Sequence, residues 1–345
     1  MANVTLKQIA NTLGISTATV SKALKDYPDI SEKTKIKVKE LAEQLKYKPN
    51  PFAQSLRNNE SKVIGLITPQ IVHHFFSNII NGVINAASKR GYLVITLQSE
   101  ESYEREKEQL NLLLDKNVDG ILLSLSDKTV QYKHINSIIE GGTPVVMYDK
   151  ISKLINCSKV IIDDRLASQK AVQHLIDTGC KKIAHIRGSL KPQTTIDRLM
   201  GYRKALELNG IKYDDRLVYE SLDLSFEDGY RLAAKIMEDH PDVDGIFAFA
   251  DLIATGALIR LKELGVKIPE DVSIIGFSNW FLTKVTSPSL STVDQPGYQM
   301  GVEAFELLYE NIQDLKNDRP MNHKVVEIST RVIARNSTKP TSSSR

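Results

Sequence analysis

The spacing of hydrophobic residues divides the chain into a short helical segment and a longer segment in which strands and helices alternate. Between Leu6 and Leu13, apolar residues recur at positions i, i+3, i+4 and i+7, which predicts one face of a helix. From Lys62 onward, continuous apolar runs such as residues 63–67 alternate with amphipathic stretches of helical length. This alternation is typical of parallel sheets covered on both faces, and the length leaves room for two of them.

The first segment carries the signals of three helices. A helix is expected to begin after each of Thr5, Ser16 and Ser31, because these hydroxyls can accept a hydrogen bond from the first turn. Thr5 and Gln8 have the spacing of a capping box, and Gly14 permits a left-handed turn between the first two helices. We expect the inward faces to consist of Val20, Ala23, Leu24, Val38, Leu41, Ala42 and Leu45, and the solvated face of the third helix to carry Lys35, Lys37 and Lys39.

The second helix leaves small polar and basic side chains exposed, namely Thr17, Ala18, Ser21, Lys22 and Lys25. Small side chains let a helix sit deep in the major groove of DNA, and Lys22 can reach a base edge or a phosphate. The pattern favours a helix-turn-helix DNA reader. A three-helix domain that binds protein fits the same pattern.

The segment that follows predicts a short conditional helix. Asn50 is a good N-cap and Pro51 a good first helical residue, but a helix ending near Arg57 has only about two turns and is marginal in water. Leu56 has little local core to join. We expect the helix to fold against a second copy and DNA, with Leu56 wedged into the minor groove. The alternative is a flexible linker whose Leu56 packs on the next domain.

Length, charge and cysteine content bound the class of protein. A chain of 345 residues suggests two or three domains. Residues 1–60 hold ten basic and six acidic residues, and the remainder holds 35 basic and 36 acidic residues, so the excess positive charge lies where a polyanionic partner would bind. Cys157 and Cys180 indicate buried thiols in a reducing compartment. Without an apolar signal core or a run of membrane length, we expect a cytoplasmic protein that has no membrane partner.

Three runs in the N-terminal segment carry a resemblance to a known family. They are Thr5-Leu6-Lys7-Gln8-Ile9-Ala10, Ser16-Thr17-Ala18-Thr19-Val20-Ser21-Lys22-Ala23-Leu24 and Tyr47-Lys48-Pro49-Asn50-Pro51. They closely resemble the lactose-repressor/galactose-repressor family of bacterial transcription regulators, and the resemblance continues to about Arg335. It implies an N-terminal all-α helix-turn-helix domain and an α/β periplasmic-binding-protein-like core of two parallel-sheet lobes. It also implies a homodimer, or a tetramer made of two dimers, on a pseudo-palindromic operator in double-stranded DNA.

The predicted boundaries follow from the pattern and the resemblance together. We place the helix-turn-helix domain at 1–48, a hinge helix at 49–60, the effector-binding core at 61–335 and a disordered tail at 336–345. Within the core, the N-lobe comprises about 61–160 and 293–322, and the C-lobe comprises about 161–292 and 323–335, with a last crossing near His323.

The resemblance also assigns the DNA contacts. Thr17, Ala18 and Lys22 would read base edges, and Leu56 would be the wedge. Ala18 departs from members with a polar residue there, so it offers only a methyl contact and base preference does not transfer. The remaining DNA-binding residues, most of them on phosphates, would be Thr5, Ser16, Thr19, Ser21, Ser31, Thr34, Tyr47, Asn50 and Gln54.

A ligand site is expected in the core, because open α/β sheets bind ligands at the carboxyl ends of their strands. Carboxylates and an arginine can hydrogen-bond hydroxyls, while aromatic faces cover the ring of a sugar or a base. Arg198 is expected to open a helix at this edge. The effector-binding residues we predict are Phe75, Phe76, Asp149, Arg198, Asp251, Ser278 and Trp280, of which the first five match the family's effector contacts.

Two departures from the family pattern leave the ligand open. Ala250 stands where an asparagine often precedes the aspartate, and Ser278 stands where an aspartate is common. Compared with a typical sugar effector of the family, the ligand then has fewer hydroxyl groups, binds in a different position, or is negatively charged and pairs with Arg198. Trp280, the single tryptophan, suits a stacking role and a core role equally.

Two further pairs of adjacent residues are interpreted as structural, rather than as a metal site or a catalytic acid. His73 and His74 are adjacent in an expected loop and point apart, so a pocket-edge role is favoured over a metal site, and we expect no metal or cofactor. In the pair Asp163-Asp164, Asp164 is interpreted as a helix N-cap rather than a catalytic acid.

Together these features predict a ligand-controlled transcription regulator, a repressor of a carbohydrate-utilisation operon, whose effector is a sugar or sugar derivative. A ligand that releases the repressor from DNA and a ligand that tightens its binding would use the same domains, so induction and corepression both stay open. An enzyme is disfavoured, because the sequence has no nucleophile elbow, P-loop or Gly-rich dinucleotide turn. Two binding functions compete with the regulator, namely a solute-binding protein that serves a transporter and a cytosolic sugar-binding protein with no role at DNA.

Overall fold

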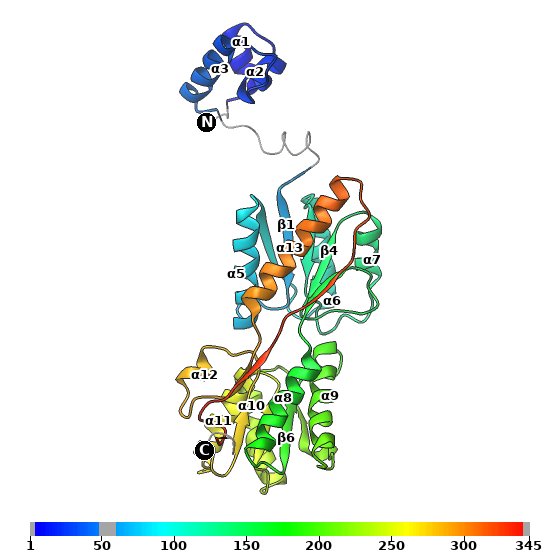
Figure 1. Ribbon diagram of the computed structural model, residues 1–345, viewed down its shortest axis with the longest axis vertical. Coiled ribbons are helices and arrows are strands. Elements are labelled where there is room, and N and C mark those ends of the chain that lie inside the picture. The colour runs from blue at the N-terminus through cyan, green and yellow to red at the C-terminus, as the bar shows by residue number, and fades with distance from the viewer. Residues whose placement is uncertain (1–3, 48–59, 341–345) are drawn as a thin grey trace. The chain divides into compact units, whose positions relative to one another are not determined.

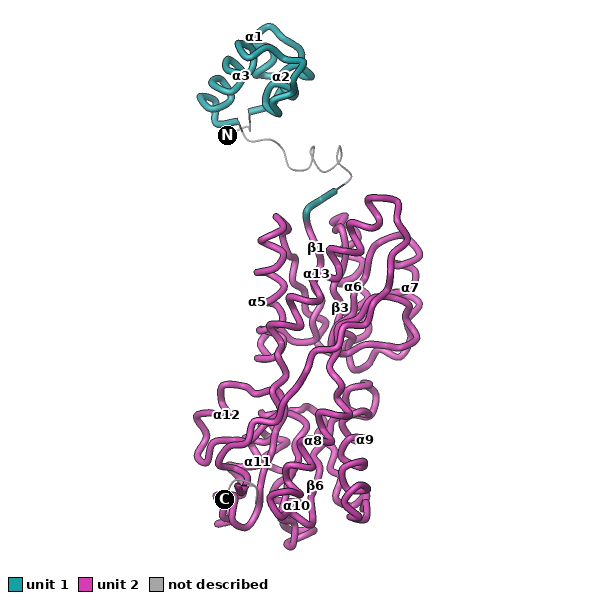
Figure 2. The backbone as a smooth tube through the Cα atoms, viewed as in Figure 1, with its two compact units in different colours: residues 1–62 teal, residues 63–345 magenta. Residues whose placement is uncertain are grey.

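A computed structural model describes residues 4–47 and 60–340 of the chain. The chain forms two compact units, residues 1–62 and 63–345, which Figure 2 colours teal and magenta. The predicted hinge helix at 49–60, with Asn50, Gln54 and Leu56, lies outside the described residues apart from Glu60.

In its described residues, the N-terminal unit has three helices, α1 (Leu6–Leu13), α2 (Thr17–Leu24) and α3 (Glu32–Gln44). Their predicted starts are confirmed. Thr5 and Gln8 form both halves of a capping box, and Ser16 and Ser31 cap the next two helices through their side-chain oxygens. Gly14 has φ +64°, as the tight turn between α1 and α2 requires.

The small core of this unit corrects two predictions. It is built from Ile9, Ala10, Val20, Ala23, Val38 and Ala42. Leu45 is 37% exposed, because α3 ends at Gln44 and Leu45 follows it as the C-cap. Lys35 is buried rather than solvated, and its Nζ lies 2.6 Å from Glu32 Oε1, so its stem can be covered while its charge is paired.

The N-lobe is a parallel sheet of six strands in the order β11-β5-β4-β3-β1-β2. Its strands are β1 (Val63–Thr68), β2 (Leu93–Gln98), β3 (Gly120–Leu123), β4 (Val145–Tyr148), β5 (Ser158–Ile161) and β11 (Val325–Glu327). Neighbouring residues of β4 join different clusters, with Val146 packing on α5 (His74–Lys89) and α13 (Gly297–Lys316). Val145 instead joins the cluster of α6 (Tyr103–Asp115) and α7 (Lys133–Glu140). The sheet is therefore covered on both faces, as the continuous apolar runs predict.

The C-lobe is a parallel sheet of four strands in the order β7-β6-β8-β9. Its strands are β6 (Ile183–Arg187), β7 (Val218–Glu220), β8 (Gly245–Ala248) and β9 (Ser273–Ile275). The longer helices are α8 (Asp164–Asp177), α9 (Gln193–Leu208), α10 (Phe226–Asp239) and α11 (Asp251–Glu263), and the short ones are α12 (Leu282–Val285) and the 3-10 turn η1 (Asp215–Leu217). Residues of α8 and α9 pack in one cluster and residues of α10 and α11 in another, so this sheet is also covered twice. Both lobes are visible in Figure 1, and the predicted fold class is confirmed.

The chain crosses between the lobes after β5, along β10 (Thr292–Asp294) and along β12 (Arg331–Ile333), and β10 and β12 pair antiparallel. The crossing predicted near His323 falls later, because β11 pairs with β5 and extends the N-lobe sheet. The expected disorder from Asn336 is wrong for residues 336–340. Buried Ser337 donates a 2.6 Å hydrogen bond to Ile274 O and accepts one from Ser291 N, which ties this stretch to the C-lobe.

Among the described helices, none is long and apolar enough to cross a membrane.

Close packing of α10 on α11 leads to the first prediction. A Cβ added at Gly229 would overlap the carbonyl group of Ile253. Gly229→Ala must therefore push the two helices apart, and we expect the free energy of unfolding to fall by about 1–3 kcal/mol in urea denaturation.

Gly141→Ala is the matched control for this change. Its added Cβ would lie 3.2 Å from Ser137 O at the end of α7, where neighbouring atoms need to move only slightly. Equal urea midpoints for the two variants would contradict a close contact between α10 and α11.

Candidate functional site

The exposed face of α2 presents Thr17, Ala18, Lys22 and Lys25 to solvent, and Ser21 is half-buried. These side chains run from the first residue of a short helix to its C-cap, and such an exposed helix face fits a DNA groove. Lys22 Nζ forms an ion pair with Asp29, and that hydrogen bond raises the pKa of Lys22. Asp29 was not predicted, since its closeness to Lys22 depends on the turn that follows α2.

The predicted phosphate contacts cluster at helix N-termini. Ser16 and Thr19 hydroxyls lie 2.8 Å apart at the start of α2, and Ser31 and Thr34 hydroxyls lie 2.8 Å apart at the start of α3. The start of a helix attracts anions, because its first N–H groups have no partner within the helix. Thr5 occupies the same place before α1.

Tyr47 is half-buried against the core of the N-terminal unit, and burial raises the pKa of its phenol. It thus lies at the end of the described part of this unit. Roles of these residues at DNA remain predictions.

In the core, the predicted effector residue Arg198 is buried. It lies within α9, which begins at Gln193, rather than opening that helix. Its guanidinium lies over the rings of Phe277, at 3.7 Å, and Phe249, at 4.3 Å. The Nε donates to Asp164 Oδ1 at 2.8 Å and Nη1 donates to Phe249 O at 2.8 Å. Arg198 therefore holds Asp164 in place.

The same contacts correct the interpretation of the Asp163-Asp164 pair. Asp163 is the N-cap of α8, because its Oδ1 accepts from Leu166 N at 2.8 Å. Asp164 is the first residue of the helix and is buried against Arg198. Its carboxylate is thus part of a buried ion pair.

Asp149 follows β4 at φ +56° and is buried at the edge of the N-lobe sheet. Burial, followed by the nearby charge of Asp164, raises the pKa of Asp149 to about 7. Its carboxyl accepts a hydrogen bond from Gln295, whose Nε2 lies 3.3 Å from Asp149 Oδ1. Gln295 Oε1 in turn accepts from Ser278 Oγ at 3.3 Å, which places Ser278 in the same chain of contacts.

Asp251 begins α11 and both of its carboxylate oxygens are occupied by protein groups. Oδ2 accepts from Trp280 N at 2.7 Å, and Oδ1 accepts from Thr292 Oγ1 at 2.6 Å. Burial raises its pKa to about 7. Asp251 therefore fixes the loop at Trp280 and the crossing strand β10 to the start of α11.

Aromatic rings line the boundary between the lobes. The Trp280 ring stacks on His74, with ring centroids 5.9 Å apart and planes at 19°, and lies 6.4 Å from His73. The ring centroids of His73 and Phe76 are 5.8 Å apart, and Phe75 and Phe76 are both buried in the hydrophobic cluster that includes residues of α5 and α13. Trp280 therefore stacks on a side chain of the other lobe, which neither of the two predicted roles described.

Two cavities open between the lobes and share Ile151, Lys153 and Gln193. One, of about 310 Å³, is rich in carboxylates and is lined by Asp149, Ile151, Lys153, Ile161, Ile162, Asp163, Asp164, Arg165, Gln193, Thr194, Asp197 and Glu327. The other, of about 180 Å³, holds three lysines and is lined by Leu125, Ser126, Tyr132, Lys150, Ile151, Ser152, Lys153, Leu154, Lys191, Pro192 and Gln193. Of the predicted effector residues, Asp149 lines the first cavity.

The lysines of the smaller cavity were missed by sequence reasoning. Lys150 forms ion pairs with Glu101, at 2.6 Å, and with Asp127, so it is fixed by acids that follow two other strands. Lys191 approaches from the C-lobe. The only signal in the sequence was the position of Lys150 directly after Asp149 at a strand end.

Across the described residues, no group of three or more His, Cys, Asp or Glu side chains is arranged to hold a metal ion. The arrangement of carboxylates, lysines and aromatic rings around a cavity is suited to binding a polar ring-shaped molecule.

Comparison with known proteins covers nearly the whole chain. Residues 5–50 match the model of the bacterial regulatory proteins of the lacI family. Residues 61–336 match the model of the periplasmic binding proteins and sugar binding domain of the LacI family.

Individual relatives agree with these matches. The chain is similar to the HTH-type transcriptional repressor PurR of Vibrio atlanticus (strain LGP32), at 32% identity over 94% of this chain and 98% of the relative. It is similar to the ribose operon repressor of Halalkalibacterium halodurans, at 31% identity over 97% of each chain. Among solved structures, the transcriptional regulator CelR in complex with cellobiose has a TM-score of 0.73 and 28% identity over 97% of this chain and 100% of that one.

A capped three-helix unit, a core of two parallel-sheet lobes and matches to both family models lead to one conclusion. The chain belongs to the LacI family of bacterial regulatory proteins and is a DNA-binding transcriptional regulator.

Proposed function

We propose that this protein is a transcriptional repressor that binds a pseudo-palindromic operator as a homodimer and responds to a small molecule held between its lobes. The observation that carries the proposal is a cavity of about 310 Å³ lined by residues of both lobes, with the buried carboxyl of Asp149 in its wall. A ligand that contacts both lobes changes the equilibrium between their relative positions, as long as it binds one position more tightly.

The effector is proposed to be a sugar or a sugar derivative. Carboxylates such as Asp149 and Asp197 accept hydrogen bonds from hydroxyl groups, and Gln193 and Thr194 add polar groups to the same cavity. The lysine-lined cavity beside it suits an acidic substituent on that sugar. A ribose operon repressor and a regulator bound to cellobiose are among the relatives, which supports a carbohydrate effector and a carbohydrate operon.

The homodimer is proposed from exposed apolar side chains on two elements of the N-lobe and one element of the C-lobe. Ile84 on α5 and Leu93 on the edge strand β2 are 44% and 65% exposed in the N-lobe. Phe281 and Val285, at α12, are 56% and 68% exposed in the C-lobe. In Figure 1, α5 and α12 lie along the same side of the core, so a second copy could cover both.

The rival functions are an enzyme and a carrier of solutes. The chain's relatives are regulators, and its N-terminal unit matches the model of the lacI family of regulatory proteins. We therefore propose a non-catalytic protein that acts in the cytoplasm, where bacterial DNA is found. A gel shift with the DNA upstream of its own gene, with and without ribose, cellobiose and sugar phosphates, tests the proposal. Failure to shift that DNA, or a shift that none of these compounds alters, counts against it.

The second prediction concerns Lys22. Lys22→Ala removes the longest side chain of the proposed major-groove contacts, and we expect operator affinity to fall about tenfold or more, the effect of losing one good base contact. Fluorescence anisotropy at fixed salt measures it.

Lys37→Ala is the control for Lys22→Ala, because it removes the same charge from an exposed position on α3. We expect it to weaken binding much less. Equal losses in the two variants would mean that Lys22 contributes only its charge.

The third prediction concerns the effector. Asp149→Asn keeps the size of the side chain and removes a carboxylate acceptor from the cavity, so effector affinity should fall about tenfold, while operator affinity without effector is retained. Isothermal titration calorimetry and anisotropy measure the two affinities. An unchanged effector affinity would remove Asp149 from the binding site.

The fourth prediction follows from the raised pKa of Asp149. A carboxyl whose pKa is raised from 3.8 to about 7 keeps its proton in the folded state, so folded protein binds more protons than unfolded protein between these values. The contribution of Asp149 to stability therefore declines as pH rises from about 4 to about 7. Asp149→Asn should be more stable than the parent at pH 8, and this advantage should shrink toward pH 5.

Urea midpoints at several pH values measure this difference between the parent and the variant. The control is Asp115→Asn, which makes the same change at an exposed position at the end of α6. A pH-independent difference for Asp149→Asn would show that this carboxyl ionises normally.

A further inference from the structure

A separate cavity of about 610 Å³ lies in the C-lobe, away from the boundary between the lobes. It is formed by three stretches, the start of β6, the second half of α9 and the loop that leads into η1. Helix α9 lines the inter-lobe cavity with Gln193 and Thr194 and this cavity with Arg203 and Leu206. At 1.5 Å per helical residue the two sites are about 15 Å apart along α9.

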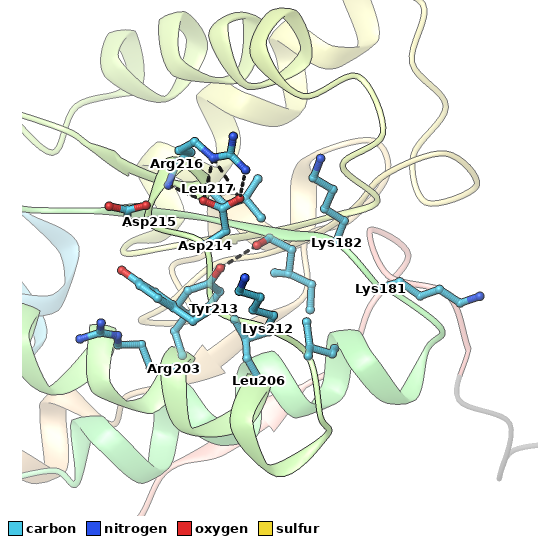
Figure 3. A pocket seen from close by; sticks show the side chains of 13 residues that line it. Lys181, Lys182, Arg203, Leu206, Lys212, Tyr213, Asp214, Asp215, Arg216 and Leu217 are labelled. Atoms are coloured by element: carbon cyan, nitrogen blue, oxygen red, sulfur yellow. Dashed lines mark hydrogen bonds and ion pairs between the residues drawn. The ribbon is translucent and has the colours of Figure 1, made fainter.

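Basic side chains dominate the rim of this cavity, as Figure 3 shows. Five of its lining residues are cationic, namely Lys181, Lys182, Arg203, Lys212 and Arg216, and two are acidic, namely Asp214 and Asp215. The cavity therefore carries an excess of positive charge.

Part of this charge is neutralised within the protein. Arg216 holds Asp214 through Nη2 at 2.6 Å, which lowers the pKa of that carboxyl to about 2, and Lys182 Nζ lies 2.6 Å from Asp242 Oδ1. Lys181, Arg203 and Lys212 form no ion pair with any side chain in the described ranges. Three cations thus remain available to an anion, against the single carboxylate of Asp215.

The floor of the cavity is apolar and aromatic. Ile183, Tyr202 and Leu206 are buried, and Tyr202 donates a 2.8 Å hydrogen bond to Ile183 O, so its hydroxyl is used inside the protein. The guanidinium of Arg203 lies 4.1 Å above the centroid of the Tyr213 ring. A guanidinium over an aromatic ring keeps its N–H groups available for a phosphate.

We propose that this cavity is a second ligand site, which binds a phosphorylated small molecule with a flat ring, of the class of a nucleoside diphosphate. Three cations in one rim fit a ligand with several negative charges, and Arg203 with Lys212 supplies the donors that phosphate oxygens accept. The stacked Arg203–Tyr213 pair and the apolar floor fit a ring. A volume of about 610 Å³ lies within the range of small-molecule sites.

The site shares no lining residue with the two cavities between the lobes. A ligand in this cavity can therefore bind while the inter-lobe cavity is empty. Its existence does not rest on the proposed function.

Titration calorimetry of the full chain with three probes tests the proposal: adenosine 5′-diphosphate, pyrophosphate and adenosine. We expect adenosine 5′-diphosphate to bind at least about tenfold more tightly than pyrophosphate or adenosine, because its phosphates and its ring each contribute to the affinity. Lys212→Glu should weaken its binding about tenfold or more through the reversed charge.

Lys204→Glu is the matched control. Lys204 is an exposed residue of α9 beside Arg203, is paired with Glu207 and lies outside the lining, so the variant changes the net charge equally without entering the cavity. We expect it to change the affinity by less than about twofold. Far-ultraviolet circular dichroism and urea midpoints verify that both variants fold.

Three results would overturn the proposal. The first is no binding of adenosine 5′-diphosphate by the parent chain. The second is an equal loss in Lys212→Glu and Lys204→Glu, which would mean that only net charge matters. The third is loss of this binding in Asp149→Asn, which would place the nucleotide in the inter-lobe cavity.

Discussion

The buried carboxylate of Asp251 fixes to the C-lobe two of the structures that connect the lobes. One oxygen accepts from the backbone of Trp280, whose ring stacks on His74 of the N-lobe, and the other accepts from Thr292 at the start of a crossing strand. A carboxyl that is removed from water is costly unless its hydrogen-bonding capacity is satisfied, and here two short bonds satisfy it. The loop and the crossing strand are consequently fixed to the start of one helix, α11. A movement of either lobe must act on this group of contacts.

Much of the architecture could be predicted from local sequence, because it depends on interactions between near neighbours in the chain. Hydroxyl caps such as Ser16 and Ser31 act within one turn, and the apolar runs of parallel strands are covered wherever they lie. The predictions fail where the structure of a segment depends on a residue that is distant in the sequence. Strand β11 is only three residues long, and it joins the N-lobe because β5 is available to pair with it. Residues 336–340 are held by Ile274 and Ser291, which no local pattern indicates.

The candidate site was predicted less completely, since a residue type at a strand end does not say which neighbours will occupy its polar atoms. Arg198 has the expected position near the sheet edge, but Asp164 and Phe249 already accept its donors. Its direct role is to position Asp164 in the wall of the cavity. Lys150 and Lys191, which come from different lobes, meet only after both lobes have folded, so their spacing in the sequence carried no signal.

The stack of Trp280 on His74 has a practical consequence. It contains the single tryptophan of the chain, and the two rings belong to different lobes. Indole emission responds to the polarity and the quenching groups in its surroundings, and separation of the lobes would expose this ring to water. The protein thus contains an intrinsic optical reporter of domain opening, which needs no added dye and gives a signal free of background from a second indole.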